Sequence, residues 1–141
     1  GATLLQEGEA DIFVHIAPAT SHVPAHEQSH EDWRRTLDAG LDQRFLQASE
    51  FAKQCQARGQ GGAILFVGAP EQSAGVDQAA AAGGLGNLTK TLGVEWARDG
   101  IRVNSILTHR NDDTVGNLAA YLVSDYAAYV TGAVMGVDEH D

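Results

Sequence analysis

The stretch from residue 78 to 104 constrains the fold more than any other part of this chain, because it predicts a long helix, a tight turn and a buried strand in succession. Residues 79–86 are mostly alanine and glycine, and small side chains let a neighbouring backbone come close. Apolar residues then follow at a spacing of four, at Leu88, Leu92 and Trp96. A glycine turn at 98–100 and branched apolar residues over 101–106 predict a helix end and a β-strand.

Two more strands and a long helix are predicted before this stretch. The apolar runs 11–15 and 63–67 are typical of parallel strands that are buried on both faces. Between them, Ser29 followed by a carboxylate three residues later resembles a capping box, so a helix is expected to begin there. A basic last turn and glycines at 58–62 predict its end.

The rest of the chain predicts a short helix and a closing strand. Aspartates at 112–113 provide an acidic start for a helix to residue 124, and the last strand is expected within 129–138. Residues 3–9 are expected to be the last turn of a preceding element. The order of elements predicts an α/β fold with a parallel sheet, formed as a single domain over residues 1–141.

Composition excludes several classes of function. Nine basic and nineteen acidic residues give a formal net charge of -10, which opposes binding to nucleic acid or to an anionic membrane. No apolar run approaches the roughly 18 to 20 residues of a membrane span. Cys55 is the single cysteine, so no internal disulfide is possible, and a reducing, cytoplasmic location is expected.

Several motifs resemble the short-chain dehydrogenase/reductase family. Leu88-Thr89-Lys90, Glu95 and the run Gly-Ile-Arg-Val-Asn at 100–104 match the family's active-site helix and the strand after it without a gap. The resemblance extends from residue 11 to 138 and implies the second half of a Rossmann-like doubly wound sheet. We therefore expect the dinucleotide-binding half to be absent from this stretch of sequence.

The same resemblance implies that four catalytic positions are vacated. The family's tyrosine and lysine fall on Gln78 and Ala82, its substrate-binding serine on Ala69, and its asparagine on Gly40. The strand-end motif Asn-Asn-Ala-Gly corresponds to residues 15–18, where only the alanine is kept. On this comparison we expect no catalytic residue and no cofactor-binding residue in this chain.

The family's subunit interface is better preserved than its active site. Its two interface helices and closing strand correspond to the following residues of this chain: Trp33, Leu37, Leu41, Phe45, Ala80, Gly84, Leu88, Leu92, Trp96, Val134 and Val137. The chain thus resembles the inactive subunit of heteromeric dehydrogenases, such as the one of anaerobic toluene and benzylsuccinate degradation. This predicts a non-catalytic subunit that supports an active short-chain dehydrogenase partner, in which NAD or NADP would be bound, with self-association also possible.

Two alternatives remain open. The chain could belong to an NAD(P)-dependent oxidoreductase, or to a lyase or isomerase that uses His15 and Asp77. It could also be a truncated product without a stable fold, because an exposed sheet edge invites association.

Two other patterns are weak. The glycines at 83–86 do not follow a strand and do not fit a phosphate-binding loop, so a close helix contact is the better interpretation. His22, His26 and His30 are spaced by four, but Pro24 interrupts the helix that would align the first two, and we expect no metal site.

Overall fold

The computed structural model describes residues 2–3, 11–16, 23–70 and 75–137 of the chain. Its strands are β1 (Ala2–Thr3), β2 (Ile12–Ile16), β3 (Gly62–Gly68), β4 (Ile101–Leu107) and β5 (Val134–Gly136). Its helices are α1 (His30–Leu37), α2 (Gln43–Arg58), α3 (Val76–Glu95) and α4 (Asp113–Val123). Short 3-10 turns lie at Ala25–Glu27, Ala97–Asp99 and Asp125–Ala127, and a π-helical turn at Asp38–Asp42 joins α1 to α2.

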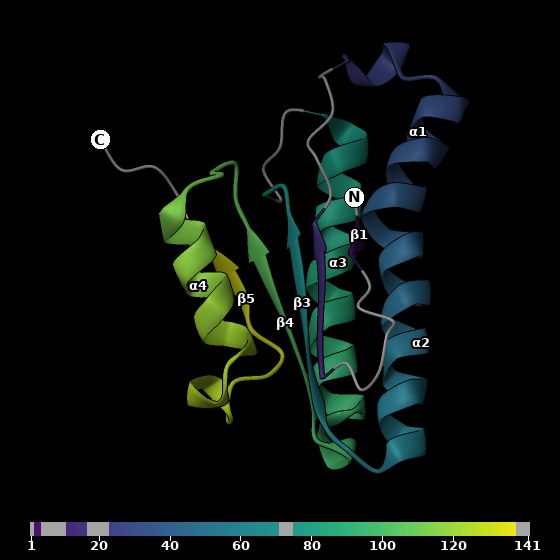
Figure 1. Cartoon of the computed structure of the whole chain (residues 1–141). Coiled ribbons are helices and arrows are strands. Elements are labelled where there is room, and N and C mark those ends of the chain that lie inside the picture. The colour runs from purple at the N-terminus through teal and green to yellow at the C-terminus, as the bar shows by residue number, and fades with distance from the viewer. Residues whose placement is uncertain (1, 4–10, 17–22, 71–74, 138–141) are drawn as a thin grey trace.

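The strands form one sheet in the order β1-β2-β3-β4-β5. β2, β3, β4 and β5 are parallel, and only β1 is antiparallel to its neighbour. Helices α1, α2 and α3 lie on one side of the sheet and α4 lies on the other (Figure 1). The predicted α/β class with a doubly wound parallel sheet is therefore confirmed.

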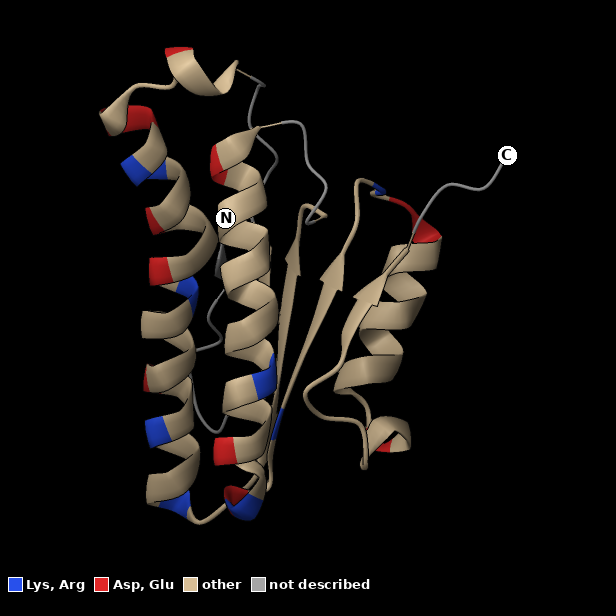
Figure 2. Ribbon diagram, turned by 180° about the vertical axis from the view of Figure 1, so that it is seen from behind, with Lys and Arg blue, Asp and Glu red and all other residues tan. Residues whose placement is uncertain are grey.

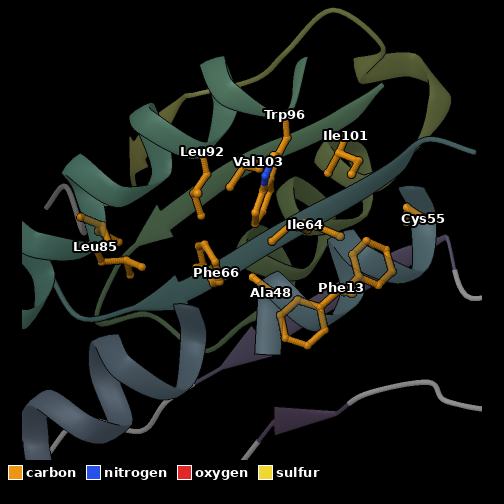
Figure 3. Packing of buried hydrophobic residues seen from close by; sticks show 13 residues of the cluster. Phe13, Ala48, Cys55, Ile64, Phe66, Leu85, Leu92, Trp96, Ile101 and Val103 are labelled. Atoms are coloured by element: carbon orange, nitrogen blue, oxygen red, sulfur yellow. The ribbon is translucent and has the colours of Figure 1, made fainter. Parts of the chain in front are cut away.

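The core has two layers because the parallel strands are buried on both faces. On the side of α2 and α3, Phe13 from β2 and Phe66 from β3 pack with Phe51 and Leu85. On the side of α4, Leu65 and Ile106 pack with residues of that helix. Figure 3 shows the first layer, in which side chains of α3 point onto β3 and β4.

The helix ends follow the signals in the sequence. Ser29 Oγ accepts a hydrogen bond from the Asp32 backbone N at 3.0 Å, which confirms the predicted cap of α1. Gly59 has a φ of 65° at the end of α2, a left-handed conformation that glycine adopts without strain. Asp112 caps α4 by accepting from the Thr114 and Val115 backbone N–H groups.

One local prediction was wrong. Thr3 belongs to a strand and not to the last turn of a preceding element, while residues 4–10 lie outside the described ranges. The closing strand, Val134–Gly136, falls within the range 129–138 in which it was expected. The π-helical turn at Asp38–Asp42 was not predicted, since such turns leave no simple spacing in the sequence.

Charged residues gather along α1 and α2, whereas α4 carries almost none (Figure 2).

None of the helices in the described ranges is long and apolar enough to cross a membrane.

Candidate active site

The parallel strands end together at one edge of the sheet. His15 pairs in register with Phe66, and Gly68 pairs with Leu107, so β2, β3 and β4 finish at nearly the same level. The backbone N–H of Thr108 donates to the Gly68 carbonyl at 2.8 Å and continues this edge by one residue. The carboxyl edge of an open parallel sheet is where α/β proteins bind their ligands.

His15 is held at this edge on the side of α2 and α3. Side chains alternate along a strand, so His15 shares its face with Phe13, which lies in the core layer under those helices. Only 5% of His15 is exposed. A buried imidazole needs a polar partner, and the structure provides one.

That partner is Arg44, from the first turn of α2. Its Nε donates to His15 Nδ1 at 3.0 Å, its Nη1 donates to the Gly40 carbonyl at 3.2 Å, and its Nη2 donates to the Val67 carbonyl. Arg44 is 3% exposed. One buried guanidinium therefore connects the π-helical turn and the ends of both β2 and β3.

Gly68 makes room for this arrangement. A Cβ at position 68 would lie 2.8 Å from Arg44 Nη1 and 3.0 Å from Nη2, closer than side-chain atoms normally approach. The guanidinium therefore rests against the bare backbone of β3, and a side chain at position 68 would have to displace it.

The charge of Arg44 is poorly compensated within the described ranges. No carboxylate there forms a salt bridge with it, and its partners are the neutral groups of His15, Gly40 and Val67. Burial lowers the pKa of Arg44 to about 10. Burial, followed by the charge of Arg44, lowers the pKa of His15 to about 4, so His15 is neutral at pH 7.

The hydrogen bond also fixes the tautomer of His15. The arginine Nε always carries a hydrogen and has no acceptor capacity, so His15 Nδ1 must be the acceptor. A neutral imidazole that accepts at Nδ1 carries its proton on Nε2. The edge therefore holds the Nε2–H group of His15, and the Arg44 guanidinium is hydrogen-bonded to the other ring nitrogen.

The four positions predicted to be vacated lie on three different segments of the chain. Gly40 lies in the π-helical turn, and a Cβ there would be 3.0 Å from Ala81 Cβ, which explains why a residue without a side chain stands at this helix contact. Ala69 follows β3 directly, and Gln78 and Ala82 lie on the first turns of α3. Their assigned roles come from the resemblance alone and stay a prediction.

Asp77 is held away from His15. Its carboxylate accepts from Thr36 Oγ1 at 2.6 Å, from Gln28 Nε2 at 3.5 Å and from the Gln78 backbone N at 2.9 Å. These bonds tie the start of α3 to α1. Among the described residues, His15 and Asp77 thus have separate hydrogen-bond partners, and the lyase or isomerase alternative stays an untested hypothesis.

The histidine series does not form a cluster in the described ranges. His22 lies outside them, His26 is on an exposed 3-10 turn, and His30 opens α1. Among the described residues, no group of three or more His, Cys, Asp or Glu side chains is placed to hold a metal ion.

The residues assigned to the interface divide into two groups. Leu92 and Trp96 are 4% and 9% exposed and lie in the core of this chain, so their spacing of four reflects internal packing and not an interface. Val134 packs partly against the same core. Trp33, Leu37 and Val137 are half-buried, and Ala80 is exposed.

The second group lines a groove between α2 and α3. Leu41, Phe45, Gly84 and Leu88 contribute to it, and its volume is about 570 Å³. Phe45 is 44% exposed and its neighbour Leu46 is 56% exposed. Gly84 allows the two helices to approach closely, since a Cβ there would lie 3.1 Å from Leu41 Cδ2. The predicted close helix contact is therefore found within this chain.

Sequence reasoning missed Arg44. Apolar residues recur at helical spacing over 37–55, including Phe45, which predicts an apolar stripe; position 44 lies within it, three residues after Leu41 and four before Ala48. A charged residue within such a stripe is the available signal, because a buried cation is costly and is seldom found without a role. Phe45 had been placed on that stripe, but it is Arg44 that is buried.

The fold and this edge define an α/β protein of the Rossmann-like class. Residues 2–109 match the family model described as "Enoyl-(Acyl carrier protein) reductase". The chain belongs to this family, that is, to the short-chain dehydrogenases/reductases.

Individual relatives agree with this assignment. The chain is 29% identical to 2-dehydro-3-deoxy-D-gluconate 5-dehydrogenase of Pseudoalteromonas atlantica, over 91% of this chain and 63% of the relative. It is 31% identical to glucose 1-dehydrogenase 2 of Bacillus subtilis, over 80% of this chain and 56% of the relative. The crystal structure of acetoin dehydrogenase from Enterobacter cloacae is 25% identical with a TM-score of 0.82, over 91% of this chain and 62% of that one. The chain thus spans roughly three fifths of the length of these proteins.

The comparisons correct one prediction from the sequence. The chain was predicted not to be an enzyme, but the proteins that it matches are named dehydrogenases, so that prediction is wrong. It rested on the four positions Gly40, Ala69, Gln78 and Ala82, and it gave His15 less weight than these vacancies.

Proposed function

We propose that this chain is part of an NAD(P)-dependent oxidoreductase that interconverts a carbonyl group and an alcohol on a small substrate. The observation that carries the proposal is the carboxyl edge of β2, β3 and β4, where the buried pair His15 and Arg44 places a proton-bearing group beside a cation. Carbonyl reduction requires both a proton donor and stabilisation of the charge that develops on oxygen. Membership of the short-chain dehydrogenase/reductase family supports the same reaction class.

The edge also suits a nicotinamide cofactor. In doubly wound sheets the dinucleotide lies across the carboxyl ends of the strands. Ala69 after β3 is half-buried and His109 after β4 is exposed, so both are accessible at the ends of these strands. When bound, the cofactor supplies or accepts the hydride.

The substrate class is drawn from three of the similar proteins. Their names refer to 2-dehydro-3-deoxy-D-gluconate, to glucose and to acetoin, while the names of two others refer to a 3beta-hydroxysteroid and to cis-4-hydroxycyclohexanecarboxylate. We propose a small hydroxy-ketone or polyol for this protein as well.

The test is cofactor binding followed by turnover. The full-length gene product is titrated with NADH and with NADPH, and oxidation of the reduced cofactor is then followed with acetoin and with sugar-derived ketones. We expect micromolar binding of one cofactor and measurable turnover with at least one of these carbonyl compounds. Binding of neither cofactor, or binding without any turnover, would refute the proposed function.

We further propose that a second subunit of the same family covers the groove between α2 and α3. Phe45 and Leu46 are large apolar side chains that stand exposed beside Leu41 and Leu88, and exposed apolar patches of this kind are typical of association sites. A second copy of the chain is the occupant that we would test first. Replacing Leu46 by Glu should shift the protein towards the monomer in native mass spectrometry, whereas Val94→Glu, on an exposed part of α3, should not.

A further inference from the structure

We propose that His15 gives the proton to the reacting carbonyl oxygen, and that Arg44 is the positioning residue that keeps the His15 ring in the required tautomer. The inference rests on the proposed function, since it assigns the proton donor of that reaction. It replaces the expectation that the chain has no group for this step, which was based on the residues at positions 40, 69, 78 and 82.

The hydrogen-bond direction determines which nitrogen can act. Nδ1 is occupied by the Arg44 Nε–H at 3.0 Å, so Nε2 carries the hydrogen. Among the described residues, no hydrogen bond involves Nε2. A substrate oxygen is therefore the acceptor that this N–H group is free to meet.

His109 also lies at this edge but is exposed, and two buried polar side chains there, Asp77 and Thr108, already have partners. The Asp77 carboxylate accepts three hydrogen bonds, and the Thr108 hydroxyl donates to the Val137 carbonyl at 2.6 Å while accepting from the Arg110 backbone. Neither glutamine nor alanine titrates, so positions 78 and 82 cannot supply a proton. Within the described part of the edge, His15 is the buried titratable group that remains.

The step balances in charge and in protons. As hydride reaches the carbonyl carbon, the electron pair of the C=O double bond moves to oxygen, the Nε2–H bond breaks and an O–H bond forms. The negative charge left on the ring is stabilised by the guanidinium bonded at Nδ1, and water returns a proton to Nε2 after the product leaves. A cation held against a weak acid in a buried site makes that acid stronger.

Two structural features hold the cation where this step needs it. The carbonyls of Gly40 and Val67 fix the far end of the guanidinium. The lack of a side chain at Gly68 lets it lie against β3.

A directional preference follows from this arrangement. Nε2 is already protonated in the resting state, so the site is prepared to give a proton and not to accept one. We expect the protein to catalyse carbonyl reduction more readily than alcohol oxidation at neutral pH.

The kinetic test uses the full-length protein with acetoin as the carbonyl probe. We expect His15→Gln to lower kcat by about 100-fold or more, with little change in the NADH dissociation constant, because general acids contribute on the order of 10² to 10⁴. Arg44→Leu should lower kcat and change the shape of the pH profile, and Arg44→Lys should restore part of the activity. The matched control is His26→Gln, an exposed histidine on a 3-10 turn, which should behave as wild type.

A second measurement needs no variant and no turnover. The ¹⁵N chemical shifts of the His15 ring at pH 7 should report a hydrogen on Nε2 and none on Nδ1, and Arg44→Leu should produce a mixture of tautomers. Wild-type kcat in His15→Gln, or a hydrogen on Nδ1, would overturn the inference while leaving the proposed function intact. Absence of cofactor binding and of turnover in the wild type would overturn both.

Discussion

Two arginines at opposite edges of the same sheet have similar partners and different consequences. Arg102, on β4 towards its amino end, donates to the carbonyls of Leu122, Ser124 and Val130 and so fastens the chain after α4. Arg44 also donates to two carbonyls, but its third partner is the imidazole of His15. A cation that binds only carbonyls stabilises a fold, whereas one that binds a titratable ring also controls the protonation of that ring.

Arg102 and Arg44 also differ in how deeply they are buried and in whether a carboxylate lies nearby. Arg102 is half-buried, and the nearby carboxylate of Asp125 partly offsets the effect of burial, which lowers the pKa of Arg102. Arg44 is almost fully buried, without a carboxylate partner in the described ranges. The comparison indicates that an uncompensated buried charge marks the functional edge of this sheet.

The largest expected effect comes from removing each charge in turn. Arg44→Leu should lower the free energy of unfolding by about 2–4 kcal/mol, since it leaves buried acceptors at His15, Gly40 and Val67 without donors. Arg102→Leu should cost about 1–2 kcal/mol, because water can reach part of its site. Urea unfolding followed by circular dichroism measures both. Equal losses would contradict the difference in burial on which the comparison depends.

The second largest effect should be a pH dependence of the free energy of unfolding that comes from His15 at the carboxyl edge. The pKa of His15 is about 4 in the folded protein and 6.5 for an unperturbed histidine. Between pH 4 and pH 6.5, His15 is therefore protonated in the unfolded chain and neutral in the folded chain. Its contribution to the free energy of unfolding is complete above pH 6.5 and decreases as the pH falls towards 4. We expect about 1–2 kcal/mol of this loss to disappear in His15→Gln, measured by urea unfolding at pH 4.5 and pH 7. An identical pH dependence in His15→Gln and wild type would contradict the neutral state of His15.

A smaller effect is expected from the glycines. Gly68→Ala would place a Cβ 2.8 Å from Arg44 Nη1, and should cost about 1 kcal/mol because the guanidinium must shift. Gly83→Ala is the matched control on α3, where a Cβ would meet nothing within 4 Å, and it should stabilise by roughly 0.5–1 kcal/mol. Thermal melting of both variants checks the pair. A higher melting temperature of Gly68→Ala would contradict the argument that a Cβ at position 68 disturbs the position of the Arg44 guanidinium.

Much of the fold could be predicted from the sequence. The apolar runs before His15 and at 63–67 determine buried parallel strands, and the caps at Ser29 and Gly59 determine where a helix begins and ends. These features depend on local chemistry, so a sequence reveals them. The fold class followed directly from their order.

The site could not be predicted in the same way. Arg44 and His15 are far apart in the sequence, and their hydrogen bond depends on how α2 packs on β2 and on the space beside Gly68. Likewise, the spacing of Leu92 and Trp96 predicts a buried stripe but does not tell whether the same chain or another one covers it. A position-by-position comparison with a family also examines the residue at the family's catalytic position, Gln78, and does not examine Arg44 on another helix.

The central claim is that burial, together with the charge of Arg44, holds His15 neutral at the carboxyl edge, and an NMR titration of the His15 ring tests it most directly. The account predicts a pKa of about 4 in the wild type and a higher value in Arg44→Leu, where the neighbouring charge is gone. A wild-type pKa near 6.5, or the same value in both proteins, would contradict it.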